Sequence, residues 1–145
     1  MSVESLESIA AAMVAPGKGI LAADESSGTI KKRFDKIGLE STEESRRTYR
    51  ELLFTTPEMA KSISGVIFYD ETLRQKTSAG VPFAQHLASL GVLAGIKVDA
   101  GAKPLAGFAN ETITEGLDGL RERLIEYYAL GARFAQHVGA AEQEG

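Results

Sequence analysis

Residues 63–71 read ISGVIFYDE, a run of β-branched and aromatic residues that ends in two acids. Two shorter runs follow the same plan, since residues 19–24 read GILAAD and residues 93–99 read LAGIKVD. Short, near-continuous apolar runs are typical of strands buried in a parallel sheet. We therefore expect three buried strands, each with charged residues at its end.

Segments with helical character separate these runs. The spacing of apolar residues predicts helices over 3–15, 28–37, 41–54, 83–90 and 117–130, and a further strand begins over 132–137. Strands that alternate with helices predict an α/β fold with a parallel sheet covered on both faces. A (β/α)8 barrel takes about 250 residues. These 145 residues are therefore either a small complete α/β domain or the first half of a larger one.

Two local features add detail to this outline. Ser41 followed by Glu44 has the spacing of a capping box at the start of a helix. Residues 107–116 form a polar stretch that we expect to be a loop.

Composition and charge exclude several classes of function. The net charge of −4 argues against a nucleic-acid or anionic-membrane surface. The absence of cysteine excludes thiolate catalysis, disulfides and zinc-thiolate sites, and two histidines argue against a multi-histidine metal centre. No stretch approaches the ~20 apolar residues of a membrane span, and the N-terminus resembles neither a secretory signal nor a transit peptide. We expect a cytoplasmic protein.

The strand ends are the candidate site. Asp24 follows the first apolar run, Asp70 and Glu71 follow the second, and Lys97 and Asp99 end the third. The carboxyl ends of parallel strands line the active sites of barrels and open α/β sheets. A partly desolvated carboxylate there serves as a general acid or base, and a lysine places a positive charge on an anion. For any one residue, an ordinary polar strand end is an equal alternative; the repetition over three strands favours a site.

Ser26-Ser27-Gly28-Thr29 precedes a predicted helix, so its backbone N–H groups could bind a phosphate, which Arg33 would also reach. A simple N-cap explains the same spacing and is preferred on spacing alone. Arg46 and Arg47 fall in the first turns of the next helix, where arginines are more often solvated than functional.

The stretch APGKGILAADES at residues 15–26 resembles class I fructose-bisphosphate aldolases. The resemblance covers residues 3 to 135 in register, with further matching blocks KRF at 32–34, TEESRRTYR at 42–50, SGVIFYDETL at 64–73, GIKVD at 95–99, PLAG at 104–107 and GLDGL at 116–120. It implies the N-terminal half of a (β/α)8 barrel over residues 1–137. The family usually forms homotetramers, and we expect self-association here because half a barrel leaves an unpaired strand edge and an uncovered inner face.

The same resemblance implies a reaction and a site. The family cleaves fructose 1,6-bisphosphate reversibly to dihydroxyacetone phosphate and glyceraldehyde 3-phosphate in glycolysis and gluconeogenesis. It uses a lysine Schiff base, with neither a metal nor another cofactor. By resemblance, Asp24 handles protons at the bond that breaks and Lys97 assists electrostatically. The residues expected at a substrate phosphate are Arg33, Arg46, Ser26 and Thr29.

This chain also departs from the family pattern at positions that the reaction needs. The Schiff-base lysine and the glutamate acid/base of the family lie on later strands, and neither position exists in this chain. The family pattern FAKWR, with its catalytic lysine, has Gln136 at the lysine position here. Residues 138–145 resemble no part of the family and suggest a truncation, a fusion remnant or a changed reading frame. We expect the chain alone to be inactive.

Two alternatives remain. One is a non-catalytic fragment that acts as a self-associating half-barrel or a sugar-phosphate binder, because half a barrel leaves an unpaired strand edge and an uncovered inner face. The other is an unrelated phosphosugar isomerase of barrel type, which only the generic strand-end carboxylates support.

Overall fold

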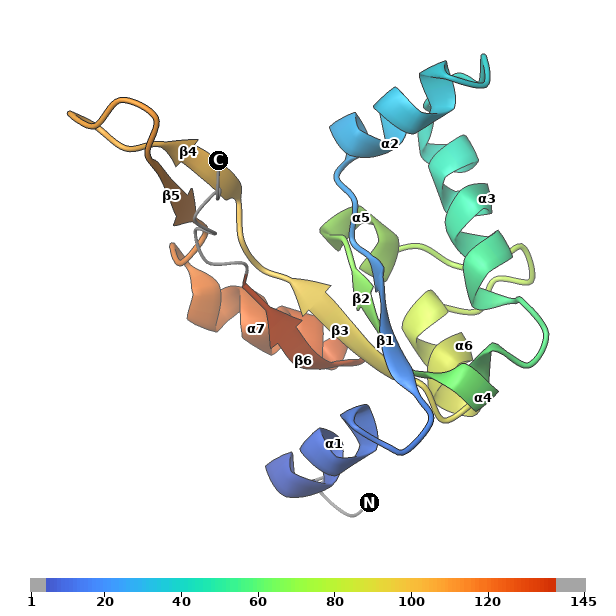
Figure 1. Ribbon diagram of the computed structural model, residues 1–145. Helices are drawn as coiled ribbons and strands as arrows, with labels where there is room; N and C mark the ends of the chain where they lie inside the picture. Colours follow the sequence, from blue (N-terminus) through green and yellow to red (C-terminus); the bar gives the residue numbers. More distant parts are fainter. Residues whose placement is uncertain (1–4, 138–145) are drawn as a thin grey trace.

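The computed structural model describes residues 5–137, and the tail expected at 138–145 lies outside the described residues. Within that range, a four-stranded parallel sheet has the order β1-β2-β3-β6 (Figure 1). Its strands are β1 (Gly19–Ala23), β2 (Ile63–Phe68), β3 (Leu93–Lys97) and β6 (Ala132–Gln136). Parallel strands that alternate with helices confirm the predicted α/β architecture and are the repeating unit of a (β/α)8 barrel.

Helices connect the strands, as the apolar spacing predicted. The helices of the described range are α1 (Leu6–Met13), α2 (Ser27–Asp35), α3 (Glu43–Phe54), α4 (Met59–Ser62), α5 (Asp70–Leu73), α6 (Phe83–Ser89) and α7 (Leu120–Ala129). The short helices α4 and α5 were not predicted. Each is four residues long, too short for a helical period to register.

The hydrophobic core lies between the sheet and helices α3, α6 and α7. Phe54 of α3 is fully buried and makes edge-to-face contacts with Phe68 of β2 and Phe83 of α6, at ring-centroid distances of 5.0 and 5.1 Å. Fully burying a phenylalanine contributes about 1.5–3 kcal/mol, and edge-to-face pairing adds to that. This core fixes the strands against the helices and so sets where their ends lie.

The opposite face of the sheet is the inner face of the partial barrel. The ring of Phe134 lies over Gly95, where an added Cβ would come within 2.2 Å of the ring, and also approaches Gly65. Ile20, at the start of β1, is 41% exposed. The central strand β2 is nevertheless buried on both faces, from Ser64 to Phe68, as expected, and the exposed part of the sheet is at its edge strand β1. In a closed barrel the opposite strands fill the inner face, and four strands cannot close.

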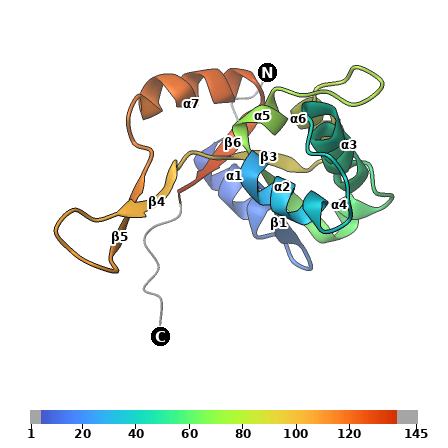
Figure 2. The same cartoon turned by 90° about the horizontal axis from the view of Figure 1, so that it is seen from above.

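The loop predicted over 107–116 is in part a β-strand, which pairs with a strand just before it to form a β-hairpin. Strands β4 (Gly101–Pro104) and β5 (Thr112–Glu115) pair antiparallel and project beyond the end of β3, away from α2 and α3 (Figure 1, Figure 2). The strands are short and mostly exposed, so no apolar alternation marks them. At the base of the hairpin Gly116 has φ +127°, and a Cβ there would come within 2.6 Å of backbone atoms of Asp99 and Ala100.

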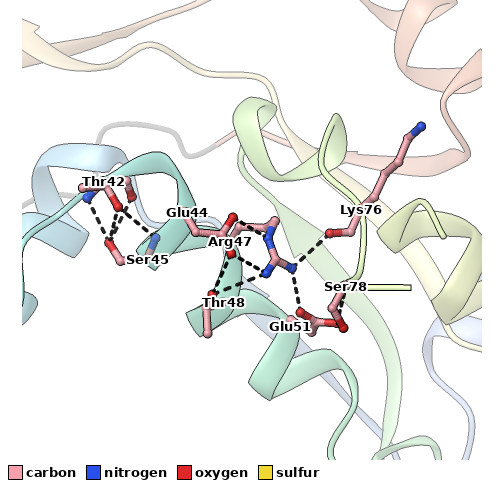
Figure 3. A network of polar contacts seen from close by, with 8 residues as sticks. All are labelled: Thr42, Glu44, Ser45, Arg47, Thr48, Glu51, Lys76 and Ser78. Atoms are coloured by element: carbon pink, nitrogen blue, oxygen red, sulfur yellow. Dashed lines mark hydrogen bonds and ion pairs between the residues drawn. The ribbon is translucent and has the colours of Figure 1, made fainter. Parts of the chain in front are cut away.

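The capping box of α3 lies one residue later than predicted. Thr42, rather than Ser41, is the N-cap, and its hydroxyl accepts the Ser45 N–H while the Ser45 hydroxyl accepts the Thr42 N–H (Figure 3). Ser41 instead binds the Arg46 guanidinium through its carbonyl and hydroxyl oxygens, at 3.1 and 3.2 Å. Ser41 thus binds Arg46 rather than capping the helix.

Candidate active site at the carboxyl edge of the sheet

Strand register brings Asp24 and Lys97 to one edge and one face of the sheet. Ala23 pairs with Phe68, and Phe68 pairs with Ile96. Asp24 and Lys97 are the next residues along β1 and β3, so they continue the same row. Strands lie about 4.8 Å apart, which places the two Cα atoms roughly 10 Å apart. That is enough room for a small substrate between the two side chains.

Lys97 is held in place by a neighbouring acid. Its ammonium lies 2.5 Å from both carboxylate oxygens of Asp99, which also accepts the Gly101 N–H at 3.0 Å. The Asp99 side chain is 1% exposed and that of Lys97 is 20% exposed. The buried Asp99 therefore holds the Lys97 ammonium at the carboxyl edge of the sheet, where a substrate can still contact it.

A cavity of about 350 Å³ opens beside this pair. It is lined by Lys97 and Asp99 of the β3 end, Tyr69 and Asp70 of the β2 end, and Tyr127 of α7, together with the base of the hairpin. Asp24 does not line it, although register places Asp24 on the same edge. The cavity therefore joins two of the three predicted strand ends.

Asp70 and Tyr127 form a coupled pair in this cavity. Hydrogen bonds from Arg74 lower the pKa of Asp70. Burial raises the pKa of Tyr127, and the nearby Asp70 carboxylate raises it further. Tyr127 lies in the helix predicted over 117–130, and nothing in the sequence indicates that it lines a cavity with Asp70.

Arg123 is another cavity residue that the sequence analysis did not single out. Its guanidinium donates to the carbonyl oxygens of Val98 at 3.1 Å, of Asp118 at 3.3 Å and of Gly116. It therefore ties the end of β3 to the base of the hairpin, which shapes one wall of the cavity.

The segment 26–29 is an N-cap. The Ser26 hydroxyl accepts the Thr29 N–H at 3.3 Å and lies 3.1 Å from the Thr29 hydroxyl. Ser26 and Thr29 thus have the local role that the spacing favours. Their backbone N–H groups remain at the N-terminus of α2, close to the end of β1.

Both arginines expected at a phosphate have carboxylate partners. Arg33 binds Glu25. Arg46 makes two parallel hydrogen bonds to Glu71, each 2.7 Å, and its side chain is 16% exposed, so it is not the solvated arginine that its place in the helix predicted. Guanidinium groups bind carboxylates and phosphates with the same fork geometry. A phosphate that binds either arginine would therefore displace the carboxylate that the arginine binds in this structure.

Arg47 binds residues of α3 and of the segment after α5, so its contacts are structural. It binds Glu44 and Glu51, and donates to the Lys76 carbonyl oxygen at 3.3 Å (Figure 3). Glu51 in turn accepts the backbone N–H of Ser78 at 2.7 Å. The network fastens α3 to the segment that follows α5.

Gln136 occupies the position of the family's lysine. It pairs with Lys97 across β3 and β6, on the inner face. A glutamine amide is neutral at all pH values and supplies no positive charge there. Among residues 5–137, no group of three or more His, Asp or Glu side chains is arranged to hold a metal ion, and no helix is long and apolar enough to cross a membrane.

A parallel β/α sheet with acid and amine groups at its carboxyl edge is the arrangement found in part of a (β/α)8 barrel. The chain belongs to the class I fructose-bisphosphate aldolase family, whose model matches residues 5–141. This confirms the resemblance carried by residues 15–26 and the blocks that follow it.

Relatives and solved structures agree with this assignment. A probable class 1 fructose-bisphosphate aldolase of Xanthomonas campestris is 64% identical over 136 residues, which cover 94% of this chain and 41% of that protein. Fructose-bisphosphate aldolase C of Carassius auratus is 58% identical, over 90% of this chain and 36% of that protein. A Plasmodium falciparum fructose-bisphosphate aldolase, solved in complex with TRAP and a small-molecule inhibitor, superposes with a TM-score of 0.85 at 54% identity. That match covers 88% of this chain and 37% of the solved one. The chain therefore spans about two fifths of the length of these relatives.

Proposed function

We propose that this chain is the part of a class I fructose-bisphosphate aldolase that supplies Asp24 and Lys97 to the active site. The observation that carries the proposal is the strand register, which places both residues on one edge and one face of the sheet in a chain of this family. The reaction is the reversible cleavage of fructose 1,6-bisphosphate to two triose phosphates in glycolysis and gluconeogenesis.

The two residues take different parts in the reaction. Carbon–carbon cleavage needs a proton removed from the C4 hydroxyl and an electron sink at C2 of the sugar. Asp24 orients the substrate and handles protons at the bond that breaks. Lys97, fixed by Asp99 and 20% exposed, stabilises negative charge on the substrate.

The substrate phosphates exchange with internal carboxylates. A phosphate at Arg33 displaces Glu25, and a phosphate at Arg46 displaces Glu71, with Ser26 and Thr29 alongside at the start of α2. A phosphate carries more negative charge than a carboxylate and accepts the same forked hydrogen bonds, which favours the exchange.

The electron sink lies outside these 145 residues. In this family a protonated imine on lysine withdraws electrons from the C3–C4 bond, so an amine replaces a metal ion. Neither that lysine nor the family's glutamate acid/base has a position here, and Gln136 replaces a third charged group. We therefore expect no turnover by this chain alone.

Trapping with sodium borohydride tests this assignment of roles. The chain is incubated with dihydroxyacetone phosphate, reduced, digested and analysed by mass spectrometry, beside a full-length class I aldolase as positive control. We expect an adduct on the control and none on this chain. Labelling of Lys97 would contradict the proposal and indicate an independent imine-forming activity.

Self-association is the second candidate property. Within the described residues, β1 and β6 are the outer strands of an open sheet, and Ile20 on β1 is 41% exposed. Open edges of this kind pair with other chains. We expect oligomers that grow with concentration in sedimentation velocity, and weaker association of Ile20→Lys. Leu6→Lys, at an 82% exposed position of α1, is the matched control. A sharp monomer boundary with cooperative unfolding would contradict this.

We infer a cytoplasmic location and expect neither nucleic-acid nor membrane partners. The name of a cytosolic aldolase of Arabidopsis thaliana, 60% identical over 121 residues, supports the location. The net charge of −4 supports the absence of a nucleic-acid surface.

A further inference from the structure

Arg50 is the largest fully buried side chain of the described residues. It lies on α3, and its side chain is 2% exposed. Arginines are almost never buried to this extent unless they are paired. The proposed reaction gives it no role, and its hydrogen bonds go to backbone carbonyl oxygens at the end of β1.

Its hydrogen bonds bracket one residue. The Arg50 Nε donates to the Ala23 carbonyl oxygen at 2.8 Å, and its Nη2 donates to the Glu25 carbonyl oxygen at 2.9 Å. These two carbonyls flank Asp24 on either side. The planar guanidinium therefore fixes the backbone before and after Asp24 from a single rigid group.

The charge of Arg50 is balanced beside the same segment. Its Nη2 lies 3.2 Å from the Glu25 carboxylate, which is 13% exposed and also binds Arg33. Burial lowers the pKa of Arg50, and the nearby carboxylates, Glu25 above all, oppose that change. A guanidinium keeps its charge in proteins, so Arg50 donates through Nε and Nη2, while its buried Nη1 has no hydrogen-bond partner among the described residues.

We propose that Arg50 is a positioning residue that holds Asp24 at the sheet edge through the carbonyls on either side of it. Strand β1 ends at Ala23, so Asp24 lies one residue beyond the last pair of the β1–β2 ladder. Through its two carbonyl bonds, Arg50 holds the backbone of this next residue in place. The inference rests on the proposed function only for the chemistry of Asp24, not for its position.

Backbone ¹⁵N relaxation of the 145-residue chain tests this. In Arg50→Lys, which keeps the charge and loses the fork, the order parameters of Asp24 and Glu25 should fall from about 0.85 to below about 0.6. Those of β2 and β3 should stay unchanged. Arg50→Gln gives the same readout if the lysine variant does not fold.

Two further variants separate the carbonyl bonds from other effects. Glu25→Gln removes the ion pair and keeps both carbonyl bonds, so Asp24 should stay ordered. Arg47→Lys, one turn earlier on α3, changes an arginine that binds Glu44, Glu51 and the Lys76 carbonyl, and should leave Asp24 ordered (Figure 3).

Three results would overturn the proposal. Asp24 could keep its order in Arg50→Lys, it could lose order in Glu25→Gln, or β2 and β3 could loosen equally, which would make Arg50 a general structural residue. The readout is local order and not turnover. Its failure therefore leaves the aldolase proposal standing, and failure of the borohydride test leaves the role of Arg50 standing.

Discussion

The two faces of the same four-stranded sheet are built on opposite plans. The outer face packs large aromatic and aliphatic side chains against three helices, with Phe54, Phe68 and Phe83 at its centre. The inner face has glycines under a single aromatic ring, Phe134, and charged residues at its edge. One face forms the hydrophobic core, and the other carries the residues of the candidate site.

This difference explains how a partial barrel folds without a closed interior. The outer face completes its core within the described residues, because each strand meets the helices that its own sequence neighbours supply. The inner face of a barrel is completed by strands across the interior. Stability therefore resides mainly on one side of the sheet, and changes to the two faces should differ in size.

The largest effect is expected on the outer face. Phe54→Ala removes a fully buried ring and its two edge-to-face contacts, and should cost about 3–5 kcal/mol of unfolding free energy. Urea unfolding followed by circular dichroism measures it. Leu52→Ala, on the same helix at a 68% exposed position, should change stability by less than about 0.5 kcal/mol. A similar loss in both variants would mean that this core is not where stability lies.

An intermediate effect is expected on the inner face. Gly95→Ala forces the Phe134 ring aside and should cost about 1–3 kcal/mol. Phe134→Leu should relieve part of that cost, so the two changes should not be additive in a double-mutant cycle. Gly28→Ala is the control, because the nearest atom to its added Cβ is 4.0 Å away. Strict additivity would show that the ring does not lie over Gly95.

The smallest effect is expected outside both faces, at Glu51 and Arg47, which connect α3 to the segment after α5. The Ser78 N–H and then Arg47 hold the pKa of Glu51 below its ordinary value. A lowered pKa in the folded chain adds stability above the unfolded value of about 4.3, and that stability is lost as the pH falls below it. Glu51→Gln should lower the free energy of unfolding by up to about 1 kcal/mol at pH 7. Below about pH 5 the free energy of unfolding of this variant should fall less steeply with pH than that of the unchanged chain.

Urea unfolding between pH 3 and pH 7 measures this effect. Glu58→Gln, in an ion pair with Lys61 whose side chains are 70% and 71% exposed, is the control for removal of a surface carboxylate. If the free energy of unfolding of Glu51→Gln falls as steeply below about pH 5 as that of the unchanged chain, the role given to the Ser78 and Arg47 contacts is contradicted.

The sequence predicted whatever depends on local pattern. Apolar runs located β1, β2 and β3, and family blocks located the barrel and its candidate site. Features that arise from packing left no such pattern. The hairpin of β4 and β5 is short and exposed, and the Arg46–Glu71 contact joins residues 25 positions apart.

The cap of α3 and the role of Arg50 were missed for a related reason. Ser41 and Thr42 both suit a capping position, and the guanidinium of Arg46 decides between them. An arginine in a helix predicts a solvated side chain, and nothing in the spacing indicates that Arg50 reaches the carbonyls around Asp24.

Intramolecular cross-linking measures the position of Asp24 relative to Lys97 most directly. The chain has no cysteine, so Asp24→Cys/Lys97→Cys carries the two thiols alone. A bis-methanethiosulfonate reagent that spans roughly 10 Å, two strand spacings, should join them within one chain. Asp24→Cys/Lys61→Cys, with the second thiol before β2 at the opposite edge, should not react in this way. Efficient linking of the first pair alone is the predicted result. If folded protein, verified by circular dichroism, links neither pair or both equally, the two groups do not share one edge of the sheet and the proposed site does not exist.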